Sequence, residues 1–225
     1  MRWITVITAT VLLSCPALRA AETAPSTRPA TLPTQLPHID VDVKNRRIRL
    51  ECEAVNAPYP LEFLVCMAGT AEHETVLRSR AKGSHLHLAL LMLGLEPGQH
   101  AVYSPEPDKR APPRGPALAI SAEFQKEGRS VTLPATRLMR DRRTRREMPA
   151  TTWVFAGSRL TEDGTYAADV TGQLVSVVNF EFTVIDVPEL RSSSNETLEW
   201  EVNPDVSPKR ETKVWLIIEP ADRNR

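Results

Sequence analysis

The sequence predicts an α+β fold in which strand outweighs helix. Short segments that alternate apolar and polar side chains recur along the chain, as expected for half-buried strands. Only one apolar segment has the length and the flanking signals of a helix. Nineteen Pro against nine Gly favour rigid connections and strand edges. A length of 225 residues with 41% hydrophobic and 25% charged content is consistent with one globular domain.

The N-terminus has the order of a secretory signal peptide, expected over residues 1–20. Met1 and Arg2 supply a positive start, residues 3–13 are mostly apolar, and small residues follow. The apolar run is too short to cross a bilayer, so no transmembrane span is expected. We therefore expect an exported protein of the periplasm, the cell envelope or the extracellular space.

Two ways of processing this signal remain open. Cleavage near Ala20 releases a free protein. The sequence LLSC at 12–15 also resembles a lipobox, which makes Cys15 a candidate lipid anchor, although Leu13 is bulky for that motif. Residues 21–37 are rich in Pro and Thr and are expected to form a linker in either case.

The first half of the folded part is expected to begin with a hairpin. Apolar residues alternate with charged ones over 39–43 and again over 48–51. A mostly apolar strand is expected over 61–67. A helix of about 84–93 should then follow, with Ser84 as its N-cap and Gly94 at its end. This helix is apolar on nearly all sides, so it should be buried against the sheet.

The second half follows a Pro-rich connector and consists mainly of strands, with glycines at the turns. The strands are expected over residues 118–124, 130–133, 152–156, 166–170, 174–178 and 213–219. Together these elements predict a strand-rich domain over residues 38–220 with one buried helix in its first half.

Cys52 and Cys66 are the two cysteines left after the signal region. Both fall on expected strands, and an exported protein lies in a compartment where a disulfide persists. The sequence does not set the distance between them, so a disulfide and two buried thiols remain alternatives.

Charge gives little indication of a partner. The formal net charge is +0 and the pI is about 7.0, so no overall field attracts nucleic acid. The basic run over 137–146 lacks the interleaved aromatic residues that stack on bases. Its guanidinium groups are nevertheless candidates for contacting anions of the envelope, the alternative being a solvated loop. The candidates are Arg140, Arg142, Arg143 and Arg146.

A cluster of acidic residues and histidines is the leading candidate for chemistry. Carboxylate and imidazole are ligands of divalent transition metals, and a His–Glu pair can also exchange protons. The spacing differs from HExxH, and two histidines two residues apart diverge on a helix. The alternative is a polar turn followed by ordinary first-turn helix residues. The candidate ligands are Glu72, His73, Glu74, His85 and His87.

Several segments resemble the YdjY-domain family. They are YPLEFLVC at 59–66, GT at 69–70, EHE at 72–74, ALL at 89–91, GLEPG at 94–98, WVFAGS at 153–158, GQLVSVVNF at 172–180 and LEWEVN at 198–203. The resemblance implies a single domain over about 38–220 and implies no particular activity.

The leading functional expectation is a non-catalytic binding or scaffolding protein without a cofactor, whose partner is an unidentified envelope component. The alternative is a metal-binding protein or metal-dependent enzyme that uses the acidic and histidine cluster. Neither the ligand nor the oligomeric state is indicated by the sequence.

Overall fold

The computed structural model describes residues 36–104, 106 and 110–221. The expected signal peptide, the candidate anchor Cys15 and nearly all of the expected linker lie outside these residues. The strands are β1 (Ile39–Asp42), β2 (Arg47–Ala54), β3 (Phe63–Met67), β4 (Thr75–Ser79), β5 (Ala117–Lys126), β6 (Arg129–Pro134), β7 (Met139–Asp141), β8 (Trp153–Phe155), β9 (Gln173–Ser176), β10 (Ile185–Asp186), β11 (Trp200–Val202) and β12 (Lys213–Pro220).

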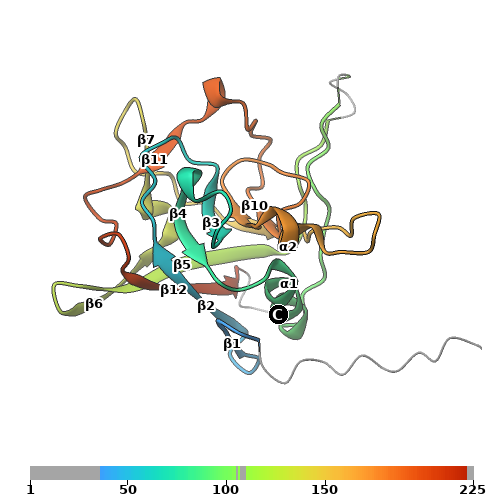
Figure 1. Cartoon of the computed structure of the whole chain (residues 1–225), viewed down its shortest axis with the longest axis horizontal. Coiled ribbons are helices and arrows are strands. Elements are labelled where there is room, and N and C mark those ends of the chain that lie inside the picture. The colour runs from blue at the N-terminus through green and yellow to red at the C-terminus, as the bar shows by residue number, and fades with distance from the viewer. Residues whose placement is uncertain (1–35, 105, 107–109, 222–225) are drawn as a thin grey trace, which may run out of the picture. The chain divides into compact units, whose positions relative to one another are not determined.

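Eight of these strands close into a barrel. The order around the ring is β2-β12-β5-β8-β10-β9-β3-β4, and β4 pairs with β2 to close it. β1 adds to β2, β6 adds to β5, and β7 pairs separately with β11. Figure 1 shows the long strands β2, β5 and β12 crossing the molecule, with the β5–β6 hairpin extending from one side.

The predicted α+β class is wrong, because helix accounts for only about 14% of the structure. The helices are α1 (Gly83–Met92) and α2 (Ala167–Thr171), with the short 3-10 helices η1 (Glu72–Glu74), η3 (Ala135–Leu138) and η4 (Asn195–Thr197). The helix predicted over about 84–93 is confirmed as α1, but its N-cap is Lys82 and not Ser84. It is buried on one side, at Leu86, Ala89 and Leu90, whereas Leu91 and Met92 are exposed. A sheet closed on itself encloses its own core, however, so it needs no layer of helices to cover it.

The interior of the ring is filled by apolar side chains. In β2 the buried positions alternate strictly, so Ile48 and Leu50 point inward while Arg47 and Arg49 lie on the outer face. Trp153 and Phe155 of β8 are fully buried in the same core. Because of this alternation, the inner face of the sheet is apolar and its outer face carries the charged side chains.

The pairing of β3 with β4 is the least expected feature of the barrel. These strands are parallel, with Phe63 beside Thr75 and Met67 beside Ser79. Parallel neighbours usually need a connection of a dozen residues or more. Here residues 68–74 suffice, because the chain turns tightly through Gly69 and η1 and Ala68 N–H donates to the Ser79 carbonyl at 2.7 Å.

Most of the other sequence expectations agree with the structure. The hairpin predicted over 39–51 is confirmed by the pairing of Ile39 with Leu50. The strand predicted over 166–170 is wrong, because Ala167–Thr171 forms α2. The side chain of Asp169 in α2 accepts hydrogen bonds from the backbone N–H and the hydroxyl of Ser84, at 2.8 and 2.6 Å. Helix α2 is therefore stabilised by a contact with a residue distant in sequence. The alternation of apolar and polar residues within 166–170 carries no information about such a contact.

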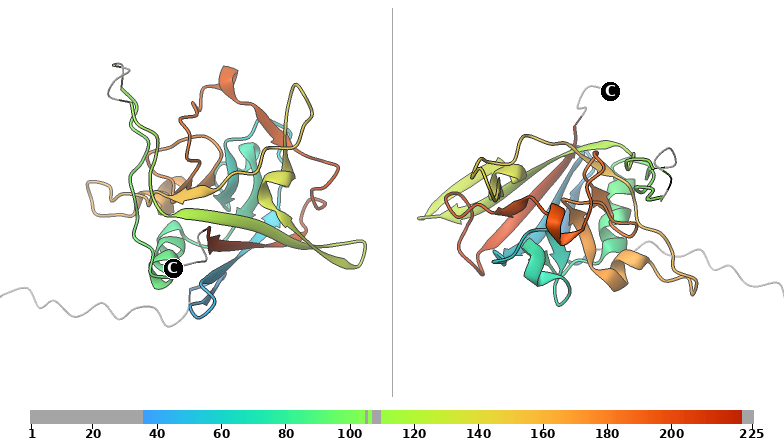
Figure 2. Two further views of the ribbon diagram at one scale, coloured as in Figure 1. Left: turned by 180° about the vertical axis from the view of Figure 1, so that it is seen from behind. Right: turned by 90° about the horizontal axis from the view of Figure 1, so that it is seen from above.

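A Pro-rich arm leaves the barrel between α1 and β5. Its two sides are joined by bridges between Gln99 and Arg114 and between Val102 and Ala111. Figures 1 and 2 show this light-green arm extending away from the body. The base of the arm is packed very tightly, because an added Cβ at Gly98 would lie 1.8 Å from the Arg114 carbonyl oxygen.

Substitution of Gly98 by Ala tests this close approach. We expect Gly98→Ala to lower the free energy of unfolding by about 2–3 kcal/mol, because two backbone segments must separate to admit the methyl group. Gly128→Ala is the matched control. It has a φ of 76° but open space around its Cβ position, so it should cost only about 1 kcal/mol. Equal losses in urea denaturation would contradict the tight packing at Gly98.

Candidate functional site

Two carboxylates meet where β3 and β4 begin. Glu62 precedes Phe63 and Glu74 precedes Thr75, so the parallel pairing of these strands places the two glutamates side by side. The Glu62 N–H donates to the Glu74 carbonyl at 3.0 Å. The carboxyl groups are close enough for Glu74 to raise the pKa of Glu62. His73 lies at the edge, with its Nε2 3.5 Å from Oε2 of Glu74 and a side chain that is 64% exposed.

The environment of this pair keeps a proton on it near neutral pH. Partial burial and, after it, the neighbouring carboxylate of Glu74 together raise the pKa of Glu62 to about 7. Two carboxylates in contact cannot both ionise without cost unless a positive charge is nearby. Among the described residues, His73 is the one basic side chain that forms an ion pair with either glutamate. Glu62 therefore keeps its proton up to about neutral pH.

Glu72 lies in the same 3-10 helix but has a structural role. Its carboxylate accepts hydrogen bonds from the Gly69 N–H and from Arg78 Nη1, both at 2.8 Å. These bonds, the one from Gly69 first, hold the pKa of Glu72 below its usual value. Arg78 also binds Glu53 on β2. Glu72 thus fixes the turn between β3 and β4 and is directed away from the Glu62–Glu74 pair.

The two helix histidines do not join this site. His87 lies on α1, where its Nδ1 is 2.6 Å from the Tyr166 hydroxyl and its ring meets Phe155 edge-on at 4.9 Å. Burial lowers the pKa of His87, which favours the neutral ring. His85 has a buried Nδ1 without a hydrogen-bond partner among the described residues. Of the five predicted ligands, the structure brings His73 and Glu74 together.

No three His, Cys, Asp or Glu side chains of residues 36–104, 106 and 110–221 form a group arranged to hold a metal ion. His73 and Glu74, with the neighbouring Glu62, nevertheless offer the imidazole and carboxylate donors that borderline metals accept. A metal would need the exposed His73 ring to turn toward the carboxylates.

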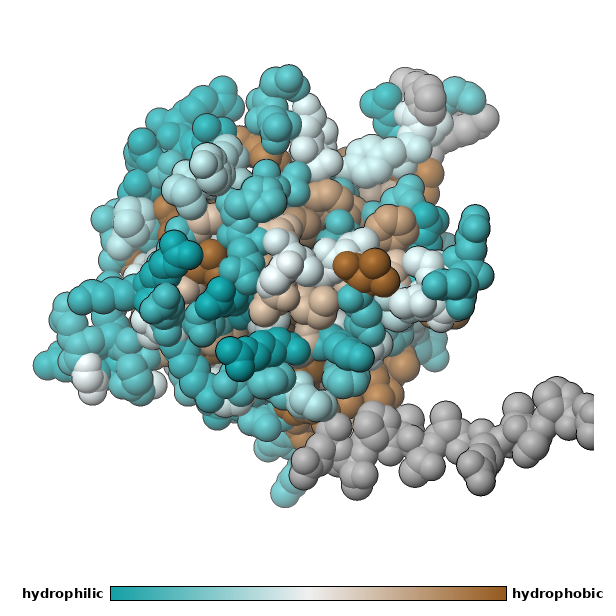
Figure 3. Space-filling model, in the orientation of Figure 1, coloured by the Kyte–Doolittle hydropathy of each residue, from teal (hydrophilic) through white to brown (hydrophobic). Residues whose placement is uncertain are grey.

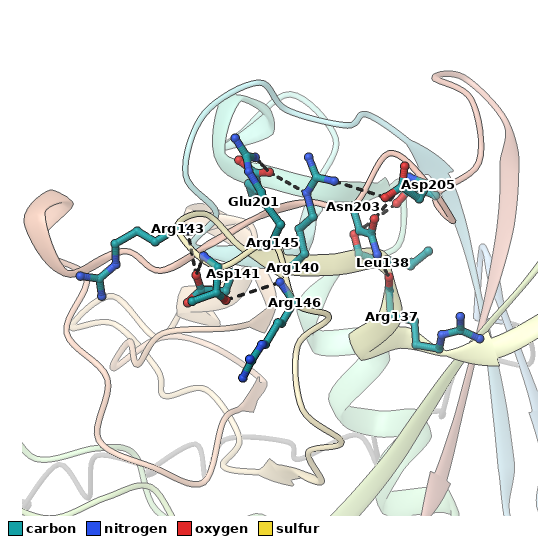
Figure 4. Close-up of polar contacts among 12 residues, drawn as sticks. Arg137, Leu138, Arg140, Asp141, Arg143, Arg145, Arg146, Glu201, Asn203 and Asp205 are labelled. Carbon is teal, nitrogen blue, oxygen red and sulfur yellow. Dashed lines mark hydrogen bonds and ion pairs between the residues drawn. The ribbon is translucent and has the colours of Figure 1, made fainter.

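Of the four candidate anion-binding arginines, one is paired with acids and a second is bound to a backbone carbonyl. Arg140 binds Glu201 at 2.7 Å and Asp205 at 3.3 Å, and Arg145 also contacts Glu201. Figure 4 shows these side chains around the β7–β11 pair. The Arg142 guanidinium donates to the Leu198 carbonyl at 3.1 Å.

The other two candidate arginines are exposed, with side chains that are unpaired within the part of the chain that the structure describes. Arg143 and Arg146 lie on the loop after β7, with no ion pair or hydrogen bond of their side chains to another described residue. The loop is fixed by Asp141, whose carboxylate accepts the backbone N–H groups of Arg143 and Thr144 at 2.8 and 2.6 Å. Backbone anchoring and neighbouring acids leave no concentrated positive site here.

Cys52 and Cys66 are both free and buried. Cys52 contacts Ser79, whereas the thiol of Cys66 contacts Thr70 and Thr75. Burial raises the pKa of Cys66 to about 11 and raises that of Cys52 further. Both thiols are therefore protonated and unreactive at neutral pH. The structure corresponds to the alternative of two buried thiols.

Sequence reasoning missed two acidic residues, Glu62 and Asp186. Asp186 is fully buried on β10, and its Oδ1 accepts bonds from Ser176 Oγ, Asn179 Nδ2 and Val187 N–H at 2.9, 3.1 and 2.8 Å. Its Oδ2 has no hydrogen-bond partner among the described residues. Burial raises the pKa of Asp186 to about 7 despite these bonds. In the sequence, Asp186 is the single carboxylate within the apolar segment 184–187, and this position could have indicated a buried acid.

A scan against protein-family models matches the YdjY domain over residues 39–219. The chain belongs to the YdjY domain family. The match begins with β1, ends within β12 and includes Glu62, His73 and Glu74. A search of curated proteins and a search of solved structures each returned no match. No helix among the described residues of this YdjY domain is long and apolar enough to cross a membrane.

In this YdjY domain, Glu62 and Glu72 should change the free energy of unfolding in opposite directions as the pH rises. The folded-state pKa of Glu62 lies above its ordinary value of 4.5, so the folded protein keeps a proton that the unfolded chain releases. Its contribution to the free energy of unfolding therefore falls as pH rises from about 4.5 to about 7. Glu72, with a lowered pKa, contributes stability above 4.5 that is lost as pH falls further.

We expect Glu62→Gln to stabilise the protein at pH 8 by roughly 1 kcal/mol, a value reduced for solvent screening of a half-buried group. Glu72→Gln should instead destabilise it by roughly 1 kcal/mol at the same pH. Urea denaturation at pH 4 and pH 8 measures both effects. A lower free energy of unfolding for Glu62→Gln than for the unsubstituted protein at pH 8 would show that ionisation of Glu62 does not destabilise the fold.

Proposed function

We propose that this YdjY-domain protein is an exported, non-catalytic binding or scaffolding protein of the periplasm or cell envelope. We further propose that it accepts a cationic group of its partner at the Glu62–Glu74 pair. The observation that carries this proposal is the proximity of two partly buried carboxylates, for which His73 is the one basic side chain among the described residues that forms an ion pair with either. A cation placed there replaces the proton on Glu62 and relieves the repulsion between the carboxylates.

The order of the first twenty residues supports export, and the Pro/Thr-rich linker suits a domain held away from its attachment point. Cleavage before Cys15 would attach the linker to a lipid anchor, whereas cleavage near Ala20 would free the domain. The filled interior of the barrel directs any partner to the outer surface. On that surface, Glu62 is a carboxyl group whose ionised form is disfavoured by partial burial and by the neighbouring Glu74.

A metal site is the second candidate function, and the contact of His73 with Glu74 favours it. The ligands would then be Glu62, Glu74 and His73, without His85 and His87. Two carboxylates and one imidazole are a donor set that zinc or manganese accepts. A metal-binding protein or a metal-dependent enzyme would follow from occupancy of this set.

Binding measurements on protein purified without a polyhistidine tag separate these functions. The probe for the first is Nα-acetyl-lysine amide, followed by NMR at pH 8 and pH 5. We expect a Kd in the millimolar range at pH 8 and at least about tenfold weaker binding at pH 5, where protons compete. Glu62→Gln should show the same loss at pH 8, and Glu72→Gln serves as the matched control that keeps binding.

Calorimetric titration with zinc or manganese chloride tests the second candidate. Stoichiometric binding that is lost in both Glu62→Gln and His73→Ala would favour the metal site over a partner's basic group. If neither the lysine probe nor either metal binds in a manner sensitive to Glu62→Gln, the proposed role of the pair is wrong.

A further inference from the structure

A separate pocket lies at the seam where the barrel closes. β2 and β4 pair only at Glu53 with Arg78 and at Ala54 with Leu77, after which the two strands separate. The gap is bridged at its base by Ser79, whose hydroxyl donates to the Glu51 carbonyl at 2.7 Å. A cavity of about 240 Å³ remains between the strands. Its lining residues are His38, Glu51, Cys52, Glu53, Ala68, Arg78, Ser79, Arg80, Glu211 and Lys213.

The charges around this seam pocket are balanced. Apart from His38, the lining contains three carboxylates and three basic side chains. The floor is formed by Cys52 and Ser79, both buried, and burial raises the pKa of the Cys52 thiol so that it stays neutral. A site of balanced charge repels neither sign overall, so it favours a ligand that carries both over a simple anion or cation.

Four of the six charged groups already have partners in the protein. Arg78 binds Glu53 and Glu72, and Lys213 binds Glu51 at 3.0 Å. The remaining two, Arg80 and Glu211, are exposed, and their side chains form no ion pair or hydrogen bond with another described residue. One unpaired cation and one unpaired carboxylate therefore border the same cavity.

The backbone on one side of the pocket is held in an unusual conformation. His38 and Glu211 have φ angles of 64° and 67°, a region that non-glycine residues seldom adopt. Glu211 is held there by its N–H, which donates to the Ala54 carbonyl at 2.8 Å. Strained residues of this kind persist where the surrounding structure fixes them, and they concentrate at functional sites.

We propose that the seam pocket binds a small free α-amino acid, with Arg80 receiving its carboxylate and Glu211 its ammonium group. Guanidinium is suited to a carboxylate because it offers two parallel N–H donors. The cavity holds roughly eight water-sized groups, taking about 30 Å³ for each. An amino acid such as glycine or serine fits within that space. Figure 3 shows the strongly hydrophilic surface over β2 and β4 where this pocket opens.

This inference is independent of the Glu62–Glu74 pair. The two sites lie at opposite ends of β4, since Glu74 precedes its first residue and Arg80 follows its last. A strand of this length separates them by about 15 Å. Substitutions at one site should therefore leave binding at the other unchanged.

Isothermal titration calorimetry with glycine and L-serine tests the proposal. We expect one site per chain, and at least about tenfold weaker binding in Arg80→Gln and in Glu211→Gln. Acetate and methylammonium each carry one of the two charges. Measured in the Glu62→Gln background, which removes cation binding at the carboxylate pair, each should bind at least about tenfold more weakly than glycine. Arg143→Gln, an exposed and unpaired arginine on another loop, and Glu62→Gln are controls that should keep full affinity.

Both test substitutions are at exposed positions, and unchanged NMR spectra of the variants would confirm that the fold is retained. No heat with glycine or serine up to about 10 mM, where millimolar sites are detected, would overturn the proposal. Binding that is unaffected by both substitutions, or acetate binding as tight as glycine binding, would also overturn it. Lysine-probe binding at Glu62 would be unaffected by any of these results.

Discussion

The parallel pairing of β3 with β4 is the constraint on which the rest of the structure depends. Residues 68–74 return the chain over the full length of β3, so that Phe63 and Thr75 become neighbours. The same return brings β4 beside β2 and closes the ring. Arg78 reinforces both steps at once, because it binds Glu53 across the closure and Glu72 in the returning turn. The closure leaves the Glu62–Glu74 pair at one end of β4 and the seam pocket at the other.

This arrangement favours the ionised form of one carboxyl group and the protonated form of another. Glu72 receives an N–H and a guanidinium, which stabilise its ionised form. Glu62 is partly buried against another acid, which favours its protonated form. Asp186 is buried deeper still, with three donors on one oxygen and none on the other. Glu62 and Asp186 are therefore the carboxyl groups whose ionised form is disfavoured in the fold. A group whose pKa is shifted in this way is a candidate position for binding a partner.

Much of the local structure could be predicted from the sequence, and most of the long-range structure could not. Alternation identified β1, β2, β5 and β12, and the apolar run identified α1. Closure of the ring depends on the β2–β4 contact, and the pattern of 75–79 alone did not indicate a strand. Among the candidate site residues, His73 and Glu74 are in contact, whereas His87 is held by Tyr166 and His85 has no hydrogen-bond partner for its buried Nδ1 among the described residues. Glu62 was missed because its neighbour Glu74 is brought to it by parallel pairing rather than by sequence distance.

The central claim is that burial and the neighbouring carboxylate of Glu74 keep a proton on Glu62 up to neutral pH. Carbon-13 NMR of the glutamate side-chain carboxyls, with the Glu62 resonance assigned from Glu62→Gln, measures this directly. The account predicts that the Glu62 resonance titrates near pH 7 and that its pKa falls in Glu74→Gln. Titration of Glu62 near its ordinary value of 4.5, or a Glu62 pKa that is unchanged in Glu74→Gln, would contradict it.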